Sequence, residues 1–207
     1  YGAPYLTFHR ADLHAALLAT CRGLGAIDLR DGFEVTEVQS VPDGVIATGA
    51  DGMQVEGSSL VAADGIWSSL RDRIAPHATL RFSGATAWRA LLPRDQVPAP
   101  FNAPGVALWL GPRAHLVHYP VRGGKLVNIV AVIEGGSAKQ GWSLRAEPGA
   151  LLPAFHRWAS PATSLLESVE TWRCWSLFRL KPLHRWTNGR VALLGDAAHP
   201  VLPYLAQ

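Results

Sequence analysis

The chain has 207 residues, of which 48% are hydrophobic and 17% are charged, and its formal net charge is +3. This composition is typical of a globular protein and excludes long disordered regions. The small, scattered positive charge argues against a nucleic-acid-binding protein. No apolar run approaches the roughly 18 residues that a membrane-spanning helix needs, so we expect no membrane partner.

The two cysteines, Cys21 and Cys174, lie far apart in the sequence. They form neither a CxxC motif nor a metal-ligand spacing, and no other cluster of candidate ligands has such a spacing. We therefore predict no metal site and a cytoplasmic protein with free thiols, while the spacing also allows one disulfide. The chain begins at Tyr1 without a signal peptide or an initiator Met and stops at Gln207 without a closing element, so we expect a fragment of a longer protein.

The first predicted element is a helix. Leu13 and Leu17 follow the spacing of one helix face, which predicts an amphipathic helix over residues 11–22. Gly23 and Gly25 follow it and offer a C-cap in the left-handed conformation.

Short strands are expected next. Alternating apolar residues predict strands over residues 33–40 and 44–48, with the tight turn Pro42-Asp43-Gly44 between them, and residues 53–55 would extend this meander. Residues 60–63 predict a short buried strand.

The strand over residues 60–63 runs directly into Asp64-Gly65. Ser69 and Asp72 then have the spacing of a capping box, which predicts the start of a helix leading towards Ile74.

The middle of the chain is richer in Trp and Pro, and its pattern predicts mainly strands. The expected strands, in chain order, cover residues 84–92, 106–111, 115–120, 125–133 and 168–177. A hairpin turn over residues 121–124 joins the third to the fourth. The spacing of Leu152, Phe155 and Ala159 predicts a helix over residues 151–159.

Near the C-terminus, residues 191–194 form an uninterrupted apolar run, which predicts a strand buried on both faces. The run ends in Gly195-Asp196, so a carboxylate stands at the carboxyl end of a strand, where α/β sheets bind their ligands. A carboxylate only accepts hydrogen bonds and suits the hydroxyls of a ribose or ribityl chain. For a bare Gly-Asp pair, an N-cap at an ordinary strand-to-helix turn is the alternative.

Three segments, in sequence order, resemble the FAD-dependent aromatic-ring monooxygenases, the group that includes salicylate and hydroxybenzoate hydroxylases. The string GRVALLGDAAHP, residues 189–200, resembles the second FAD-contacting motif of this family. The string LVAADGIWSSLR, residues 60–71, resembles its Asp-Gly motif, and HRADL, residues 9–13, resembles the segment whose arginine helps to hold the cofactor. Residues 115–122 and 175–183 are also similar to salicylate-hydroxylase-type sequence, so the resemblance covers nearly the whole chain.

The resemblance implies roles for individual residues. Gly195, Asp196 and Ala197 would lie at FAD, with Asp196 receiving a ribityl hydroxyl. Arg10 would lie close to the ribityl or phosphate portion of the flavin. Pro203 falls where the family places a proline beside flavin and substrate.

The Asp-Gly motif would supply further cofactor contacts. By resemblance, Asp64, Gly65 and Arg71 lie near the dinucleotide phosphates and the route of the nicotinamide cofactor. Ala63 stands where a glycine commonly precedes the motif.

The more serious departure from the family is the missing N-terminal βαβ unit with its Gly-x-Gly-x-x-Gly phosphate-binding turn; the helix after Gln207 is missing too. Gly23-Leu-Gly25 cannot replace this turn, because it follows a helix and has no third glycine. The missing turn would supply the helix N-terminus that binds the pyrophosphate. We therefore expect these 207 residues alone to bind FAD weakly or not at all.

The substrate side depends on one predicted strand. Residues four apart in a strand face the same way, so His115 and Tyr119 share a face while His118 points to the other. They are either half-buried sheet residues with local hydrogen bonds or groups that act on a phenolic substrate. The resemblance favours the second interpretation: His115 would polarise or deprotonate a phenol, and Tyr119 would orient it.

The predicted fold class is α/β (α+β): a partial, Rossmann-like FAD-binding domain with an inserted, mainly antiparallel β-sheet domain for the substrate. We expect the FAD-binding part over residues 1–75, the substrate sheet over residues 76–180 and a return to the FAD-binding part over residues 181–207.

The implied function is an FAD- and NADH- or NADPH-dependent monooxygenase that hydroxylates a small phenolic acid, with molecular oxygen as co-substrate and a flavin hydroperoxide as the hydroxylating species. The alternatives are another FAD-dependent oxidoreductase, such as a halogenase or a reductase, and a non-catalytic fragment unable to hold FAD.

Overall fold

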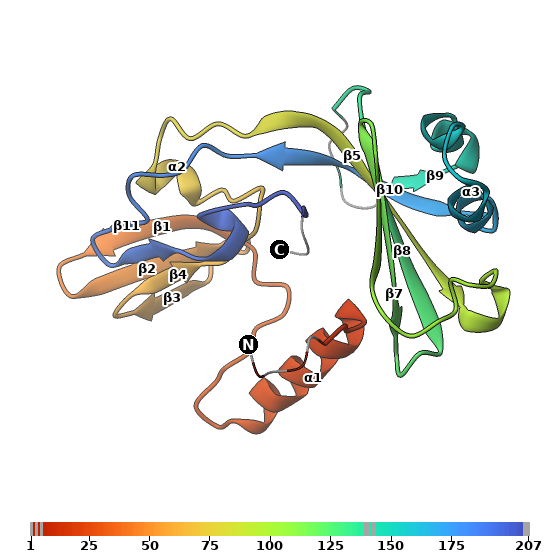
Figure 1. The fold of residues 1–207 in the computed structure, drawn as a ribbon. Coiled ribbons are helices and arrows are strands. Elements are labelled where there is room, and N and C mark those ends of the chain that lie inside the picture. Colours follow the sequence, from red (N-terminus) through yellow and green to blue (C-terminus); the bar gives the residue numbers. More distant parts are fainter. Residues whose placement is uncertain (1, 3, 5, 139–140, 142–143, 205–207) are drawn as a thin grey trace. The chain divides into compact units, whose positions relative to one another are not determined.

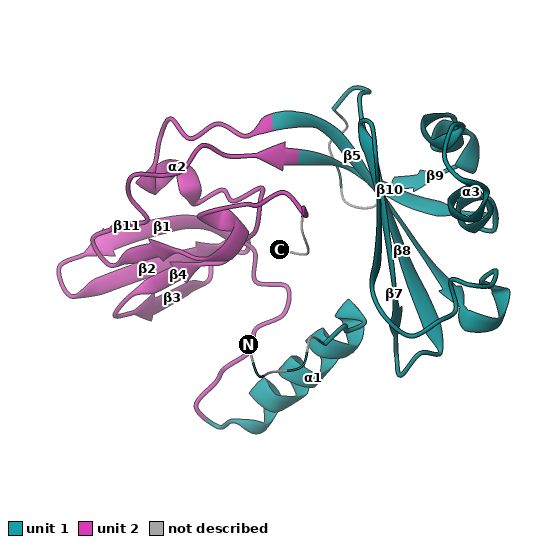
Figure 2. Cartoon of the chain, in the orientation of Figure 1, with its two compact units in different colours: residues 1–25, 82–177 teal, residues 26–81, 178–207 magenta. Residues whose placement is uncertain are grey.

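The computed structural model describes residues 2, 4, 6–138, 141 and 144–204. Two compact units divide the chain: residues 1–25 with 82–177, called unit 1, and residues 26–81 with 178–207, called unit 2 (Figure 2). Each unit has its own apolar core.

Unit 2 begins with a three-stranded antiparallel meander of β1 (Val35–Val41), β2 (Gly44–Gly49) and β3 (Gln54–Gly57) (Figure 1). The tight turn predicted at Pro42-Asp43-Gly44 is confirmed: Val41 pairs with Gly44, so the turn itself is Pro42-Asp43 and Gly44 already belongs to β2.

A second small sheet of unit 2 joins segments from opposite ends of the chain. β4 (Leu60–Ala62) runs parallel to β12 (Val191–Leu193), which also pairs with β11 (Thr187–Asn188). The core of the unit includes apolar side chains of both sheets, among them Val38, Val45, Ala62, Val191 and Leu193. The predicted burial of the strand over residues 60–63 is wrong for Val61, which is 59% exposed because it faces away from this core.

The core of unit 1 is a six-stranded sheet in the order β6-β7-β8-β5-β10-β9. The strands are β5 (Arg81–Pro93), β6 (Ala107–Gly111), β7 (Ala114–Val121), β8 (Leu126–Glu134), β9 (Leu144–Ala146) and β10 (Trp172–Arg179). β6, β7, β8 and β5 pair in antiparallel fashion, as do β10 and β9. The predicted hairpin over residues 121–124 is confirmed, whereas β9 was not predicted.

One face of this sheet is covered by the segment that follows β9. Buried residues Leu151, Phe155, Leu165 and Leu166 pack against the sheet, and Leu116 on β7 is fully buried beneath them. In Figure 1, this covering segment and α3 (Ser160–Glu167) lie beside β9 and β10.

The predicted helix over residues 151–159 is wrong. Within this stretch only residues 152–155 are helical, as the 3-10 turn η3 (Leu152–Phe155); another 3-10 turn, η2 (Pro148–Ala150), precedes it, and the α-helix begins only at Ser160. Proline fixes φ and lacks an N–H, so it favours the first turn of a helix. Pro161 lies in the first turn of α3 and sets the later start.

The predicted first helix is α1 (Arg10–Gly23), but none of its residues is buried. Leu13 and Leu17 are exposed, so no core built from the described residues covers the apolar face of the helix. The left-handed C-cap expected at Gly23-Leu-Gly25 is also wrong, because the cap residue Leu24 has an extended backbone with φ −96°.

Two polar contacts join the N-terminal segment to the end of β7. The Thr7 hydroxyl donates to the Pro120 carbonyl at 2.7 Å. Arg122 donates to both carboxylate oxygens of Asp12, from Nε at 2.7 Å and from Nη2 at 2.6 Å. The hydrogen bond from Arg122 lowers the pKa of Asp12 to about 2. These contacts explain why residues 1–25 group with the sheet.

The predicted α/β class with an inserted antiparallel sheet is confirmed. The domain boundaries predicted at residues 75/76 and 180/181 stay a prediction. The boundaries between the compact units that flank the large sheet lie at residues 81/82 and 177/178. Among the described residues, no helix is long and apolar enough to cross a membrane.

Candidate functional site

The Asp-Gly and Gly-Asp motifs lie at the carboxyl ends of two neighbouring parallel strands. Ala62 of β4 pairs with Leu193 of β12, and the Leu194 N–H donates to the Ala62 carbonyl at 2.9 Å. Asp64-Gly65 and Gly195-Asp196 follow directly, so the strand end predicted before Gly195-Asp196 is confirmed, and Asp64-Gly65 follows the neighbouring strand at the same edge.

Both glycines of these motifs have the left-handed backbone conformation. The φ angle is +81° at Gly65 and +60° at Gly195. A Cβ at either position would meet no neighbour within 4 Å, so backbone conformation and not crowding favours glycine there.

Arg71 joins the two motifs. Its side chain donates from Nε to the Ala197 carbonyl at 2.7 Å and from Nη2 to the Asp196 carbonyl at 3.0 Å. Nη2 also donates to the carbonyls of Ile66 at 2.9 Å and Gly65 at 3.3 Å. One guanidinium therefore holds both loops, and Arg71 is only 3% exposed.

Burial lowers the pKa of Arg71, while the carboxylates of Asp64, Asp72 and Asp196 oppose this change. Sequence reasoning expected this arginine to lie near phosphates. In the structure its Nε and Nη2 donors bind backbone carbonyls, so its first role is to position the two loops. A role towards phosphates stays a prediction.

The start of α2 (Arg71–Ile74) differs from the predicted capping box. Neither Ser69 nor Asp72 caps the helix. Instead, the Asp64 carboxylate accepts from the Ser69 N–H at 3.0 Å, and the Ser68 hydroxyl accepts from the Arg71 N–H at 3.0 Å. Asp64 thus orders its own loop, because the turn from β4 brings it back over the helix start.

Asp196 differs from Asp64 in that its carboxylate accepts no hydrogen bond from the described residues and is exposed. The neighbouring Ala197 is buried and small. An exposed, acceptor-only group beside small residues at a strand end fits the hydroxyl-bearing chain of FAD. His199, which follows, stacks on Trp186, the residue before β11, with ring centroids 4.8 Å apart.

The predicted substrate residues lie on β7 in unit 1. Burial alternates along this strand: Leu116 and His118 face the covered side, whereas His115, Val117 and Tyr119 are half-buried on the other. His118 packs edge-on against Phe101 with ring centroids 5.1 Å apart. Burial lowers the pKa of both His115 and His118, so both rings favour the neutral form.

The remaining two predicted residues, Arg10 and Pro203, belong to different units. Arg10 is the exposed first residue of α1 in unit 1. Pro203 is exposed in unit 2, on the segment after η4 (Gly195–Ala197). Their roles stay predictions.

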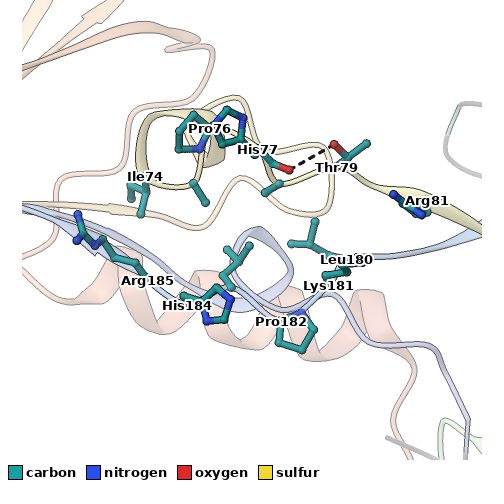
Figure 3. Close-up of a pocket in the computed structure, with 13 residues that line it drawn as sticks. Ile74, Pro76, His77, Thr79, Arg81, Leu180, Lys181, Pro182, His184 and Arg185 are labelled. Carbon is teal, nitrogen blue, oxygen red and sulfur yellow. Dashed lines mark hydrogen bonds between the residues drawn. The ribbon is translucent and has the colours of Figure 1, made fainter.

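Sequence reasoning missed two features. A pocket of about 410 Å³ in unit 2 is lined by residues 74–79, 81 and 180–185 (Figure 3). Its titratable side chains are all basic: His77, Arg81, Lys181, His184 and Arg185. None of the predicted site residues lines it. The second feature is a pair of polar side chains, Arg89 and Asn128, that interrupt apolar strands of the six-stranded sheet.

The family model for the FAD binding domain matches residues 3–207. A 3-hydroxybenzoate 6-hydroxylase of Aquipseudomonas alcaligenes is 35% identical over the whole chain, and a 3-amino-4-hydroxybenzoate 2-monooxygenase of Streptomyces platensis is 39% identical. The chain spans 52% of each of these relatives.

Solved structures also match nearly the whole chain, over about half of their own length. A salicylate hydroxylase in complex with its substrate superposes with a TM-score of 0.80 at 30% identity, covering 94% of this chain and 52% of that one. The Klebsiella pneumoniae protein HpxO, solved with FAD and uric acid, superposes with a TM-score of 0.78 at 26% identity over 96% of this chain and 50% of that one. The predicted partial FAD-binding domain with its inserted sheet is thereby confirmed.

Proposed function

Since the chain belongs to the FAD-binding-domain family, whose curated relatives here are aromatic hydroxylases, we propose that it is part of an FAD- and NAD(P)H-dependent monooxygenase acting on a small phenolic acid. The observation within this chain that carries the proposal is the paired placement of Asp64-Gly65 and Gly195-Asp196 at adjacent strand ends, held together by Arg71.

In this proposal, each unit has its own task. In unit 2, the exposed Asp196 carboxylate accepts a hydrogen bond from a ribityl hydroxyl of FAD, and Gly195 and Ala197 leave space for its chain. Asp64-Gly65 supplies further contacts to the dinucleotide, as does Arg10 from unit 1, and Pro203 borders the reacting ring. The redox chemistry and the activation of oxygen come from FAD when it is bound.

In unit 1, the sheet positions the substrate. A ring nitrogen of neutral His115 accepts the proton of the substrate hydroxyl, because a phenolate ring is the better nucleophile towards an electrophilic oxygen. The Tyr119 hydroxyl donates to the same substrate oxygen and fixes its position. The names of the relatives, which include hydroxybenzoate and aminohydroxybenzoate enzymes, support a phenolic acid as the substrate class.

The test uses the full-length protein that contains this chain. We expect a bound flavin spectrum, and oxidation of NADH or NADPH that is stimulated by a phenolic acid and yields its hydroxylated product in equal amount. Salicylate, 3-hydroxybenzoate and 4-hydroxybenzoate form the first substrate panel. Flavin reduction without oxygen insertion into any phenol would contradict the monooxygenase proposal and favour a reductase.

A separate prediction concerns the 207 residues expressed alone. We expect them to bind FAD weakly or not at all, since the part of the site seen here offers a hydroxyl acceptor, Asp196, but no glycine-rich phosphate turn. Equilibrium dialysis against FAD measures this binding directly. A flavin spectrum that co-purifies with the isolated 207 residues would contradict the expectation.

A further inference from the structure

Arg89 and Asn128 lie on the same face of the six-stranded sheet as His115 and Tyr119. Tyr119 on β7 pairs directly with Asn128 on β8. Val117 pairs with Val130, which in turn pairs with Arg89 on β5. Directly paired residues of antiparallel strands point to the same face, and residues two apart along a strand share it. Arg89, Asn128 and Tyr119 therefore share one face of three neighbouring strands, with Tyr119 opposite Asn128 and Arg89 diagonal to Asn128.

The opposite face of the sheet is the apolar core. The neighbours of these residues in each strand, Trp88, Ile129 and Leu116, all belong to the core cluster. Arg89 and Asn128 thus do not point into the packed core, although they stand in otherwise apolar strands.

Two N–H donors on the polar face have no acceptor among the described residues. They are Nδ2 of Asn128 and Nε of Arg89, both inaccessible at the atom. Asn128 is only 8% exposed. An unmatched buried donor is costly, whereas a bound acceptor removes that cost. Two such donors on one sheet face match a carboxylate, which has two acceptor oxygens and no donor.

The surroundings of Arg89 also favour an anion. Its guanidinium lies 5.2 Å from the ring centroid of Trp175, which limits its orientation. Burial lowers the pKa of Arg89; the groups whose charges also act on this pKa are Tyr119 and Arg10, and neither is a carboxylate.

We propose that Arg89 and Asn128 form the subsite that binds the carboxylate of the aromatic acid, and that Arg89 is the residue that selects acids over neutral phenols. This inference rests on the proposed function, because it places the ring over Tyr119 on the same sheet face. The carboxylate then lies at the Arg89 side, and the hydroxyl lies on the side of His115.

The experiment measures equilibrium binding to the full-length protein by calorimetry, without turnover. The probes are 3-hydroxybenzoate and 3-hydroxybenzyl alcohol, which differ in charge at one substituent. We expect the wild-type protein to bind the acid about 100-fold more tightly, the effect of one or two hydrogen bonds to a charged group. In Arg89→Met, the affinities for the two probes should differ by no more than about threefold, because the substitution weakens the binding of 3-hydroxybenzoate only.

Three further variants separate a binding role from a structural one. Arg89→Lys keeps the charge and should restore part of the preference for the acid. Asn128→Asp places a carboxylate beside Arg89, so the protein should stay folded. It should lose its affinity for 3-hydroxybenzoate and still bind 3-hydroxybenzyl alcohol. Arg145→Met, on the exposed strand β9, removes an arginine elsewhere in the same sheet and should change neither affinity.

Kinetics add a second readout. In Arg89→Met, KM for 3-hydroxybenzoate should rise about 100-fold, while kcat at saturation changes much less. A preference for the acid that survives in both Arg89→Met and Asn128→Asp overturns the subsite, as does a wild-type protein that binds neither salicylate nor the hydroxybenzoates. A protein that binds these acids through Arg89 but hydroxylates none of them contradicts the proposed function alone.

Discussion

Arg71→Ala is expected to lower the free energy of unfolding of unit 2 by about 3 kcal/mol and to abolish flavin retention. The substitution removes four hydrogen bonds from a buried cation to carbonyls of two loops, and hydrogen bonds to charged groups are the stronger class. Without them, Gly65 and Asp196 lose their common support at the sheet edge. Urea unfolding followed by circular dichroism measures the loss, and hydrogen exchange in peptides covering residues 60–75 and 191–200 locates it.

The matched control is Arg73→Ala. Arg73 lies on the same short helix but is exposed, so its removal should change the free energy of unfolding by less than about 0.5 kcal/mol. Arg71→Lys keeps the charge but not the planar set of donors, so its loss in free energy of unfolding should lie between those of Arg71→Ala and Arg73→Ala. An Arg71→Ala protein that unfolds like the wild type and shows normal exchange, yet binds FAD poorly, would mean that Arg71 contacts the cofactor and does not hold the loops.

His115→Ala in the full-length protein is expected to lower the rate of coupled hydroxylation about 100-fold, the usual contribution of a general base. Oxidation of the nicotinamide should continue and yield hydrogen peroxide in place of product. Burial lowers the pKa of His115, so the wild-type ring stays neutral to a pH below its ordinary 6.5. The acid limb of kcat/KM should therefore lie below pH 6.5 and should disappear in the variant.

The comparison for this variant is His118→Gln, three residues along the same strand. His118 faces Phe101 in the core, so its replacement should affect stability without uncoupling reduction from hydroxylation. Stability also links to pH here: a folded pKa below the unfolded value means that unfolding takes up protons, so stability falls as the pH drops below about 6.5. Normal coupling in His115→Ala with a phenolic acid would refute its assignment as the base.

The sheet strands could be predicted because their signals are local. Alternation and turn residues identified β1, β2 and β7, and the hairpin after β7 followed from its two glycines. The stretch at residues 151–159 failed because apolar spacing does not distinguish an α-helix from successive 3-10 turns when prolines set the boundaries.

The connections between distant segments could not be predicted in the same way. The side chain of Arg71 binds backbone carbonyls up to 126 residues away. Every residue has a backbone carbonyl, so the sequence does not indicate which of them an arginine binds. Asp64 could be located by resemblance, but its bond to the Ser69 N–H depends on the path of the turn. Arg89 and Asn128 carried a usable signal: each is a polar residue inside an apolar strand, which is costly unless it has a partner.

The order of the strands in unit 1 has a consequence for how such proteins diversify. The chain enters the sheet along β5 and leaves it along β10, and these strands are neighbours. Because both junctions lie side by side, residues 82–177 can be exchanged between relatives as one cassette with two splice points. Such a graft has one constraint outside the cassette: Arg122 binds Asp12 of α1, so a donor sheet without a matching cation would lose this ion pair to the helix.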